Sequence, residues 1–172
     1  MATKIHPLSE LPRALLDGRA VFDCGRPALN QYLAQNAAQH EARNVTRTFC
    51  GEQGGVLFGY YALTNASVDV SALPPDVVKK YKLPTHQLPV VRLARLAVDI
   101  RFQGKGLGQF LMIDALSRVI RVAESSGCIG LIVDAKDDKA AGFYEDFGFR
   151  RAPDNGLLLF MPLPEIQALF QG

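Results

Sequence analysis

Three glycines occupy alternate positions in the middle of the chain, directly before an amphipathic run. Gly104, Gly106 and Gly108 belong to the segment "QGKGLG", which lies shortly after the apolar segment "RLAVD". A strand that runs into a glycine-rich turn and then into a helix presents backbone N–H groups at the positive end of the helix dipole. Glycine also lets the backbone approach an anion closely, because it has no Cβ. This pattern favours binding of a phosphorylated ligand.

Two common phosphate-binding motifs do not fit these glycines. A Walker A loop requires Gly-Lys followed by Ser or Thr, but Lys105 is followed by Gly106. A Rossmann fingerprint, GxGxxG, requires a third glycine at the position where this chain has Gln109. The alternative without a ligand is a turn that needs flexible residues only to reverse the chain. The spacing alone leaves the identity of the ligand open.

Strand and helix patterns around the glycines predict a mixed α/β sheet. Apolar residues at helical spacing predict helices at residues 26–43, 106–127 and 138–148. Apolar and β-rich runs predict strands at residues 46–51, 55–70, 90–99, 128–135 and 156–163. Residues 73–89 are rich in proline and predict a loop with one helical turn. A strand–helix–strand order implies a parallel pair, whereas the hairpin at "EQGG" implies antiparallel pairing.

Composition indicates an ordinary globular protein. The chain has 172 residues, of which 48% are hydrophobic and 21% charged, so we expect a single domain over residues 1–172. The formal net charge of +2 gives no general case for nucleic-acid binding, so any basic surface would be local. The N-terminal segment lacks the apolar core of a signal peptide, and no apolar run reaches transmembrane length. We therefore expect a cytoplasmic protein without a membrane partner.

The cysteines and histidines predict neither disulfides nor a metal site. They are scattered along the chain as Cys24, Cys50, Cys128, His6, His40 and His86. The odd number of cysteines and the absence of CxxC spacing fit reduced thiols in a cytosolic protein. No metal cofactor is expected.

The segment "QGKGLG" after "LAVD" resembles the Gln/Arg-x-x-Gly-x-Gly/Ala signature of the GNAT superfamily of N-acetyltransferases. The resemblance implies a GNAT-type fold: a mixed, mostly antiparallel sheet with a splayed parallel strand pair, around Leu96 and Leu131, and flanking helices. It also implies acetyl-CoA as cosubstrate, with the pantetheine arm paired to the backbone of Leu96, Ala97 and Val98. The residues implied to bind the coenzyme pyrophosphate are Gln103, Gly104, Lys105, Gly106, Leu107 and Gly108.

A second segment, "AAGFYEDFGF" at residues 140–149, resembles the closing helix and strand of the same family. In that family a tyrosine lies near the coenzyme sulfur, and Tyr144 takes that place here. When an amine attacks a thioester, a phenol nearby can protonate the departing thiolate or hydrogen-bond to it. The alternative is a tyrosine that only packs beside Phe143 and Phe147. Many members carry Asn in the loop before this helix, where this chain has Asp137, so the coenzyme contact of that residue is not carried over.

Three segments together resemble the GNAT toxins of bacterial type II toxin–antitoxin modules: "FDCGRPALNQYL", "RLAVDIRFQGKGLG" and "VDAKDDKAAGFYEDFGFR". This resemblance spans nearly the whole chain. It implies direct transfer of acetyl from acetyl-CoA to the α-amino group of the amino acid on charged tRNA, which blocks translation. It further implies a ribbon-helix-helix antitoxin as partner and a homodimer. An α-amino group has a lower pKa than a lysine, which would explain why no His or Glu stands at a motif position as general base.

A tRNA substrate requires cations that bind phosphate. The candidates are Arg92 and Arg95, which are three residues apart on one strand, so that their side chains leave opposite faces. The family pattern has a basic residue at Arg95 but an apolar one at Arg92. Two alternative functions are acetylation of a protein N-terminus or small amine, and a non-catalytic acyl-CoA-binding regulator. Tyr144 in its motif argues against the regulator, because a protein that only binds needs no acid near the sulfur.

Overall fold

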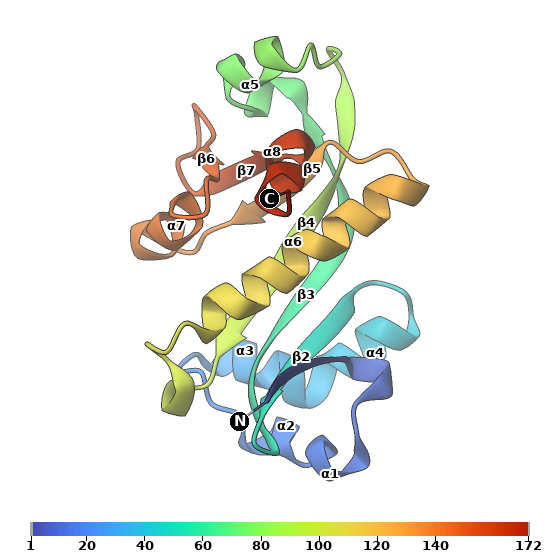
Figure 1. The fold of residues 1–172 in the computed structure, drawn as a ribbon, viewed down its shortest axis with the longest axis vertical. Coiled ribbons are helices and arrows are strands. Elements are labelled where there is room, and N and C mark those ends of the chain that lie inside the picture. The colour runs from blue at the N-terminus through green and yellow to red at the C-terminus, as the bar shows by residue number, and fades with distance from the viewer. Residues whose placement is uncertain (1, 172) are drawn as a thin grey trace. The chain divides into compact units, whose positions relative to one another are not determined.

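The computed structural model describes residues 2–171, which divide into two compact units (Figure 1). The first unit consists of the chain up to Thr64 together with Ala94–Ala115, and the second consists of Asn65–Leu93 together with the chain from Leu116 onward. Three elements run from one unit into the other: β3 (Val56–Asp69), β4 (Gln87–Val98) and α6 (Leu107–Ser125). The glycine segment therefore belongs to the first unit and Tyr144 to the second.

The strands of the described chain form one sheet in the order β1-β2-β3-β4-β5-β7-β6. The bounds of the remaining strands are Thr3–Pro7 for β1, Arg47–Gln53 for β2, Gly130–Asp134 for β5, Arg150–Arg151 for β6 and Leu158–Pro162 for β7. The pairs β1–β2, β2–β3, β5–β7 and β6–β7 are antiparallel, whereas β4 and β5 are parallel. This confirms the mixed, mostly antiparallel sheet with one parallel strand pair.

The parallel ladder is short compared with β4 itself. It joins Val91, Arg92 and Leu93 of β4 to Leu131, Ile132 and Val133 of β5. Beyond this ladder β4 continues to Val98, whereas the N–H of Ala135, directly after β5, donates to the carbonyl of Leu157 at 2.7 Å. The parallel pairing is therefore confined to the part of β4 that belongs to the second unit.

In the first unit, short helices pack beside β1 and β2 (blue in Figure 1). They are η1 (Leu8–Glu10), α1 (Arg13–Leu16), α2 (Gly18–Val21), α3 (Pro27–Gln31), the π-helical segment η2 (Tyr32–Asn36) and α4 (Ala37–Ala42). The helix predicted at residues 26–43 forms as α3, η2 and α4 in succession, and it begins at Pro27, whose fixed φ suits the first helical position. The core of this unit includes Phe22, Tyr32, Leu33 and Tyr60.

In the second unit, an apolar core including Val68, Leu88, Ile132 and Phe160 lies among the strands and helices. The helical elements wholly in this unit are η3 (Val70–Ala72), α5 (Pro75–Lys80), α7 (Asp138–Glu145) and α8 (Leu163–Leu169). The proline-rich segment at residues 73–89 contains the single short helix that was predicted. Helix α7 confirms the short helix at residues 138–148, and the chain leaves it through Gly148 at φ 106°.

Helix α6 confirms the long amphipathic helix after the glycines. The apolar stripe predicted on this helix consists of Leu107, Leu111, Ala115, Val119 and Val122, of which the first four are buried and Val122 is half-buried. The helix is 19 residues long, but neither it nor any other helix in residues 2–171 is apolar enough over a sufficient length to cross a membrane.

The sequence patterns did not predict β1, β6, α1, α2 or α8. Strand β1 has a burial pattern without alternation, because four of its five residues are half-buried. Helix α8 has seven residues, which is too short to display a repeated apolar stripe, and Pro lies in its first turn. These elements form through pairing and packing with distant segments, so local periodicity carries little sign of them.

Candidate active site

The predicted contacts to the coenzyme arm are the last three residues of β4, in the first unit. Ala97 is buried, while Leu96 and Val98 are half-buried. The parallel ladder to β5 ends before this point, at Leu93. Backbone N–H and C=O groups at the end of a strand beyond its ladder can pair with an extended ligand. This geometry fits the arm of a coenzyme that lies along β4.

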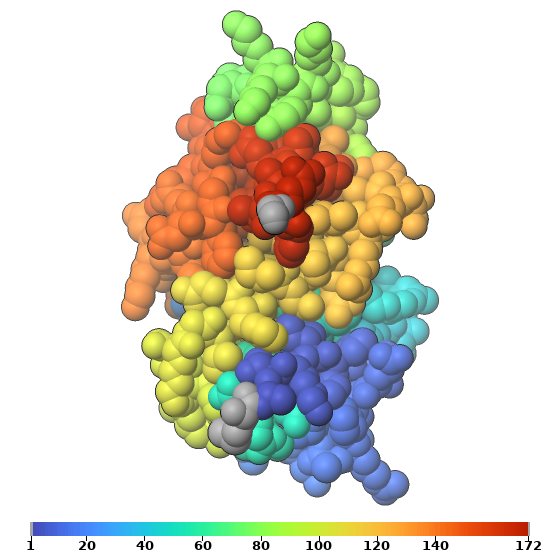
Figure 2. Space-filling model, in the orientation of Figure 1, coloured from blue at the N-terminus to red at the C-terminus, as the bar shows by residue number. Residues whose placement is uncertain are grey.

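The loop after β4 is built on two glycines in the left-handed region. The short 3-10 helix η4 (Ile100–Phe102) leads into Gly104 at φ 76° and Gly106 at φ 80°. An added Cβ would meet no atom within 4 Å at Gly104, and only Oε1 of Gln109, 4.0 Å away, at Gly106. Residues 103–106 lie exposed on the surface (yellow in Figure 2). The glycines thus form an open turn that an anion can approach.

Helix α6 begins immediately after this turn. The N–H of Phe110 donates to the carbonyl of Gly106 at 3.1 Å, so the N–H groups of the preceding residues lie at the open end of the helix. The helix dipole makes this end positive, and the exposed Lys105 adds a full charge. These features fit a pyrophosphate. The third glycine of the motif, Gly108, lies inside the first turn of α6, whereas Gly104 and Gly106 lie in the turn before the helix.

Arg95 lies over the ring of Tyr32 in the first unit. The guanidinium carbon is 3.8 Å from the ring centroid, and no described carboxylate forms an ion pair with Arg95. Tyr32 is buried, and its hydroxyl hydrogen-bonds with Oγ1 of Thr46 at 2.7 Å and Oγ1 of Thr48 at 3.2 Å. Arg95 is therefore a half-buried cation that is held on a fixed aromatic ring and is available to an external anion.

Arg92 has a different environment, in the second unit. Its Nη1 atom donates to Oδ2 of Asp134, the last residue of β5, in a close ion pair. The carboxylate of Asp134 offsets much of the positive charge of Arg92. Of the two arginines predicted from the sequence, Arg95 is the better candidate to bind a phosphate.

Tyr144 lies near the end of α7 and is 8% exposed. Its ring makes edge-to-face contacts with the rings of Phe143 and Phe149, with ring centroids 5.3 Å and 5.7 Å apart. Phe147 packs against Phe143. Asp137 caps this helix, because its Oδ1 accepts a hydrogen bond from the N–H of Ala140 at 2.8 Å. The residue that departs from the family pattern therefore has a clear structural role.

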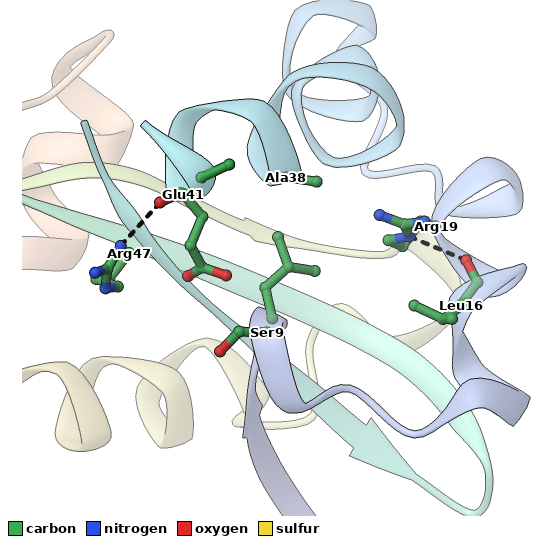
Figure 3. Close-up of a pocket in the computed structure, with 8 residues that line it drawn as sticks. Ser9, Leu16, Arg19, Ala38, Glu41 and Arg47 are labelled. Atoms are coloured by element: carbon green, nitrogen blue, oxygen red, sulfur yellow. Dashed lines mark hydrogen bonds between the residues drawn. The ribbon is translucent and has the colours of Figure 1, made fainter. Parts of the chain in front are cut away.

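A cavity of about 480 Å³ also lies in the first unit (Figure 3). It is lined by Leu8, Ser9, Leu16, Arg19, Ala38, Glu41, Ala42 and Arg47. Both arginines donate to backbone carbonyls of neighbouring residues, Arg19 to Leu16 and Arg47 to Glu41, each at 3.1 Å. None of the residues predicted to bind the coenzyme, and neither Arg92 nor Arg95, lines this cavity.

The thiols are not paired in disulfides. Cys50 is buried, whereas Cys24 and Cys128 are half-buried. Burial raises the pKa of the Cys50 thiol to about 12, so it stays protonated. Within residues 2–171, no cluster of three His, Cys, Asp or Glu side chains could hold a metal ion.

Two residues of this region were not identified from the sequence. Tyr32 was read only as part of a helix, and its contact with Arg95 depends on folding. Asp99, the residue after β4, is 1% exposed, and its carboxylate accepts from the backbone N–H groups of Asp23 and Arg101. An aspartate directly before a turn was the available signal, because its side chain often accepts from an N–H two residues later.

Comparison with known proteins gives a consistent result. Residues 19–149 match the Acetyltransferase (GNAT) family. A tRNA-acetylating toxin from Mycobacterium tuberculosis (strain ATCC 25618 / H37Rv) is 35% identical over 160 residues, which is 92% of this chain and 95% of that protein.

Two solved structures of AtaT are also similar over nearly the whole chain. AtaT complexed with acetyl-methionyl-tRNAfMet is 30% identical with a TM-score of 0.87, over 99% of this chain and 100% of that chain. A tyrosine-to-phenylalanine mutant of AtaT, bound to the C-terminus of the antitoxin AtaR and acetyl-CoA, is 28% identical with a TM-score of 0.81, over 99% of each chain. Because the family match covers well over half of the chain and the loop geometry agrees with it, the chain belongs to the GNAT acetyltransferase family.

Proposed function

We propose that this protein transfers the acetyl group of acetyl-CoA to the α-amino group of the amino acid on charged tRNA and thereby blocks translation. The observation that carries the proposal is the similarity, over 99% of the chain, to AtaT in complex with acetyl-methionyl-tRNAfMet. The 35% identity to a tRNA-acetylating toxin supports the same reaction.

The described residues fit acetyl-CoA as cosubstrate. The glycine turn at residues 103–106 and the start of α6, with Leu107 and Gly108, would hold the pyrophosphate through backbone N–H groups and the helix dipole. The end of β4, at residues 96–98, would pair with the pantetheine arm. Acetyl-CoA supplies a thioester carbonyl that an amine can attack without a covalent enzyme intermediate.

Tyr144 would act as the general acid. The neutral amine forms a bond to the acetyl carbon, and the bond between that carbon and sulfur breaks. The Tyr144 hydroxyl donates a proton to the departing sulfur, while the amine loses a proton to solvent, from which Tyr144 is reprotonated. An α-amino group has an ordinary pKa of about 8, so a useful fraction is neutral at physiological pH.

Arg95 would contact the phosphates of the tRNA. Its guanidinium is held against Tyr32 and has no carboxylate partner among the described residues, which leaves its N–H groups for a phosphate. Arg92 would contribute less, because Asp134 already pairs with it.

The proposed reaction also suggests the cellular partners. A toxin of this kind requires an antitoxin, and a mutant of the similar AtaT was solved with the C-terminus of the antitoxin AtaR. We extend the proposal to a ribbon-helix-helix antitoxin, a homodimer, a single acetyltransferase domain over residues 1–172 and a cytoplasmic location, where charged tRNA is found.

A cell-free translation extract tests the proposed function directly. The protein is added with and without acetyl-CoA, and the charged tRNA pool is analysed by mass spectrometry. We expect translation to stop only with acetyl-CoA, and the acetyl group to be on the α-amine of the esterified amino acid. Acetylated protein N-termini together with an unmodified charged tRNA pool would contradict the tRNA substrate and support a peptide acceptor.

A further inference from the structure

The FDCG segment (residues 22–25) and the loop after β4 (residues 99–106) are joined by hydrogen bonds within the first unit. The two segments are far apart in the sequence, and the FDCG segment has no place in the proposed reaction. The residue at the centre of their contact is Asp99, whose side chain is 1% exposed.

The Asp99 carboxylate accepts four hydrogen bonds. Its Oδ1 accepts from the backbone N–H of Arg101 at 3.0 Å and from Nε of Arg101 at 2.9 Å. Its Oδ2 accepts from Nη2 of Arg101 at 3.0 Å and from the backbone N–H of Asp23 at 3.1 Å. One carboxylate therefore fixes the first turn of the loop and the FDCG segment together.

Three further bonds connect the same two segments or fix the end of β4. The N–H of Ile100 donates to the carbonyl of Asp23 at 2.8 Å. The amide of Gln103 donates to the carbonyls of Cys24 at 3.2 Å and Val98 at 2.8 Å. The loop is thus bound to the FDCG segment by residues before and after η4. Gln103, which follows η4, directly precedes Gly104, the first glycine of the loop with a positive φ.

The FDCG segment is itself fixed to the core and to α3. Phe22 is 3% exposed. Oδ1 of Asp23 accepts from the N–H of Gly25 at 2.8 Å and from Nδ2 of Asn30 at 3.0 Å. Oδ1 of Asn30 in turn accepts from the N–H of Cys24 at 2.8 Å. A rigid segment of this kind can hold the loop in one conformation.

A glycine loop without such support would lose conformational entropy when it binds a ligand. Each residue that must be ordered on binding loses backbone conformational entropy. Support that orders the loop beforehand removes part of this cost and strengthens binding. The buried carboxylate is compatible with an anionic ligand nearby, because Arg101 forms a bidentate pair with it and is itself 54% exposed.

We propose that Asp99 is a positioning residue of the acetyl-CoA site, which holds the glycine loop against the FDCG segment in its binding conformation. Asp99 acts through the loop and does not itself contact the coenzyme. The inference rests on the proposed role of the loop in acetyl-CoA binding, and it is independent of the acceptor.

Calorimetric titration of the full chain with coenzyme A measures this role. We expect Asp99→Asn to raise the Kd for coenzyme A by about tenfold, the scale expected from lost charge-assisted hydrogen bonds. The KM for acetyl-CoA should rise in proportion, while kcat at saturating acetyl-CoA and the KM for charged tRNA should stay close to the wild-type values.

Asp69→Asn is the matched control. Asp69 precedes η3 as Asp99 precedes η4, and its Oδ1 accepts from the N–H of Ser71, two residues later, at 2.9 Å. Asp69 lies in the second unit and has no contact with the glycine loop among its hydrogen bonds, so its replacement should leave the Kd for coenzyme A unchanged.

Three outcomes overturn the inference. The first is an unchanged Kd in Asp99→Asn with a lower Tm, which would make Asp99 a residue of the fold alone. The second is a fall in kcat without a change in Kd. If Asp99→Asn does not fold, Asn30→Ala decides, because it removes the bonds that fix Asp23 and Cys24 to α3, and an unchanged Kd in this variant also overturns the inference. A wild-type protein that binds coenzyme A but does not acetylate charged tRNA would contradict the proposed function and leave this inference standing.

Discussion

The guanidinium of Arg95 lies over the ring of Tyr32, with 3.8 Å between the guanidinium carbon and the ring centroid. A guanidinium has five N–H donors, so one that lies over an aromatic ring still has donors for a phosphate. Tyr32 is 2% exposed, and its hydroxyl is fixed by two threonines, so the ring is a rigid support. The orientation of Arg95 is therefore set before a ligand arrives.

The first prediction compares Arg95→Ala with Arg92→Ala. If Arg95 binds a tRNA phosphate, its loss should weaken binding of charged tRNA and lower the slope of log K against log salt concentration by about one. Arg92 already pairs with Asp134, so Arg92→Ala should change the slope little. Filter binding at several salt concentrations measures both values.

The affinity for coenzyme A serves as the control for this comparison. Equal salt slopes for Arg95→Ala and Arg92→Ala would show that Arg95 does not bind a tRNA phosphate. A loss of coenzyme A affinity in Arg95→Ala, with unchanged tRNA binding, would instead assign Arg95 to the phosphates of the coenzyme.

The second prediction concerns Gly106→Ala. Alanine at φ 80° is strained by roughly 1–2 kcal/mol, and the new Cβ would lie at the turn that we propose binds pyrophosphate. The matched control is Gly55→Ala, in the turn between β2 and β3, where φ is also 80° and no atom lies within 4 Å of an added Cβ. Both variants should lower Tm by similar amounts, but only Gly106→Ala should weaken binding of coenzyme A in calorimetry. Equal affinities in the two folded variants would contradict the pyrophosphate assignment.

The sequence predicted the parts of the site that depend on local pattern. The glycine turn, β4 and α6 were predicted correctly because strand alternation, glycine spacing and helical periodicity are all local signals. The seven-stranded order was not predictable in full, because β1 reaches the sheet only by pairing with β2.

The contacts that distinguish individual residues could not be predicted. Strand spacing and the family pattern distinguish Arg92 from Arg95, but the contacts with Asp134 and Tyr32 that set their environments are tertiary and appear only in the structure. Asp137 was read only as a departure from a family pattern, although its helix-capping role follows from an ordinary local rule.

The third prediction uses the burial of Cys50. Its thiol has an ordinary pKa of 9.0, and burial raises this pKa to about 12. Iodoacetamide at about pH 8 should therefore modify Cys24 and Cys128 in the native protein, and Cys50 only after unfolding, because the thiolate is the reactive form. Peptide mass spectrometry distinguishes the three sites. Modification of Cys50 in the native protein at the rate of Cys128 would contradict its burial.

The raised pKa of Cys50 also predicts how the free energy of unfolding changes at high pH. The unfolded chain ionises Cys50 as pH rises above 9.0, whereas the folded chain keeps it protonated. The free energy of unfolding should therefore fall as pH rises through this range. Cys50→Ala should reduce this slope in denaturant titrations at pH values from about 8 to 10, and a slope equal to that of the wild type would contradict the prediction.

The fourth prediction uses the ionised Asp99. Burial by itself raises the pKa of Asp99, but the hydrogen bonds from Arg101 and Asp23 outweigh it and hold the pKa below the ordinary value of 3.8. A folded-state pKa that is lowered contributes stability above the unfolded value, and this stability is lost as pH falls through the folded pKa. Wild type should therefore lose more stability than Asp99→Asn between about pH 5 and pH 2. If wild type and Asp99→Asn lost the same free energy of unfolding over this pH range, Asp99 would not have a lowered pKa in the folded protein.

The last prediction separates the two roles of Tyr144. Its ring packs against Phe143 and Phe149, and Tyr144→Phe keeps this packing while it removes the hydroxyl. If the hydroxyl protonates the departing thiolate, kcat should fall by about 100-fold or more, within the range of general-acid contributions. The Kd for coenzyme A should change little, because it does not depend on the proton transfer. Tyr81→Phe is the matched control: its hydroxyl donates to Oε2 of Glu165 at 2.9 Å, so this variant should lower Tm but leave kcat unchanged. The rates are measured as the release of thiol from acetyl-CoA with charged tRNA as acceptor. If Tyr144→Phe is as active as the wild type, Tyr144 is not the general acid and its role is packing alone.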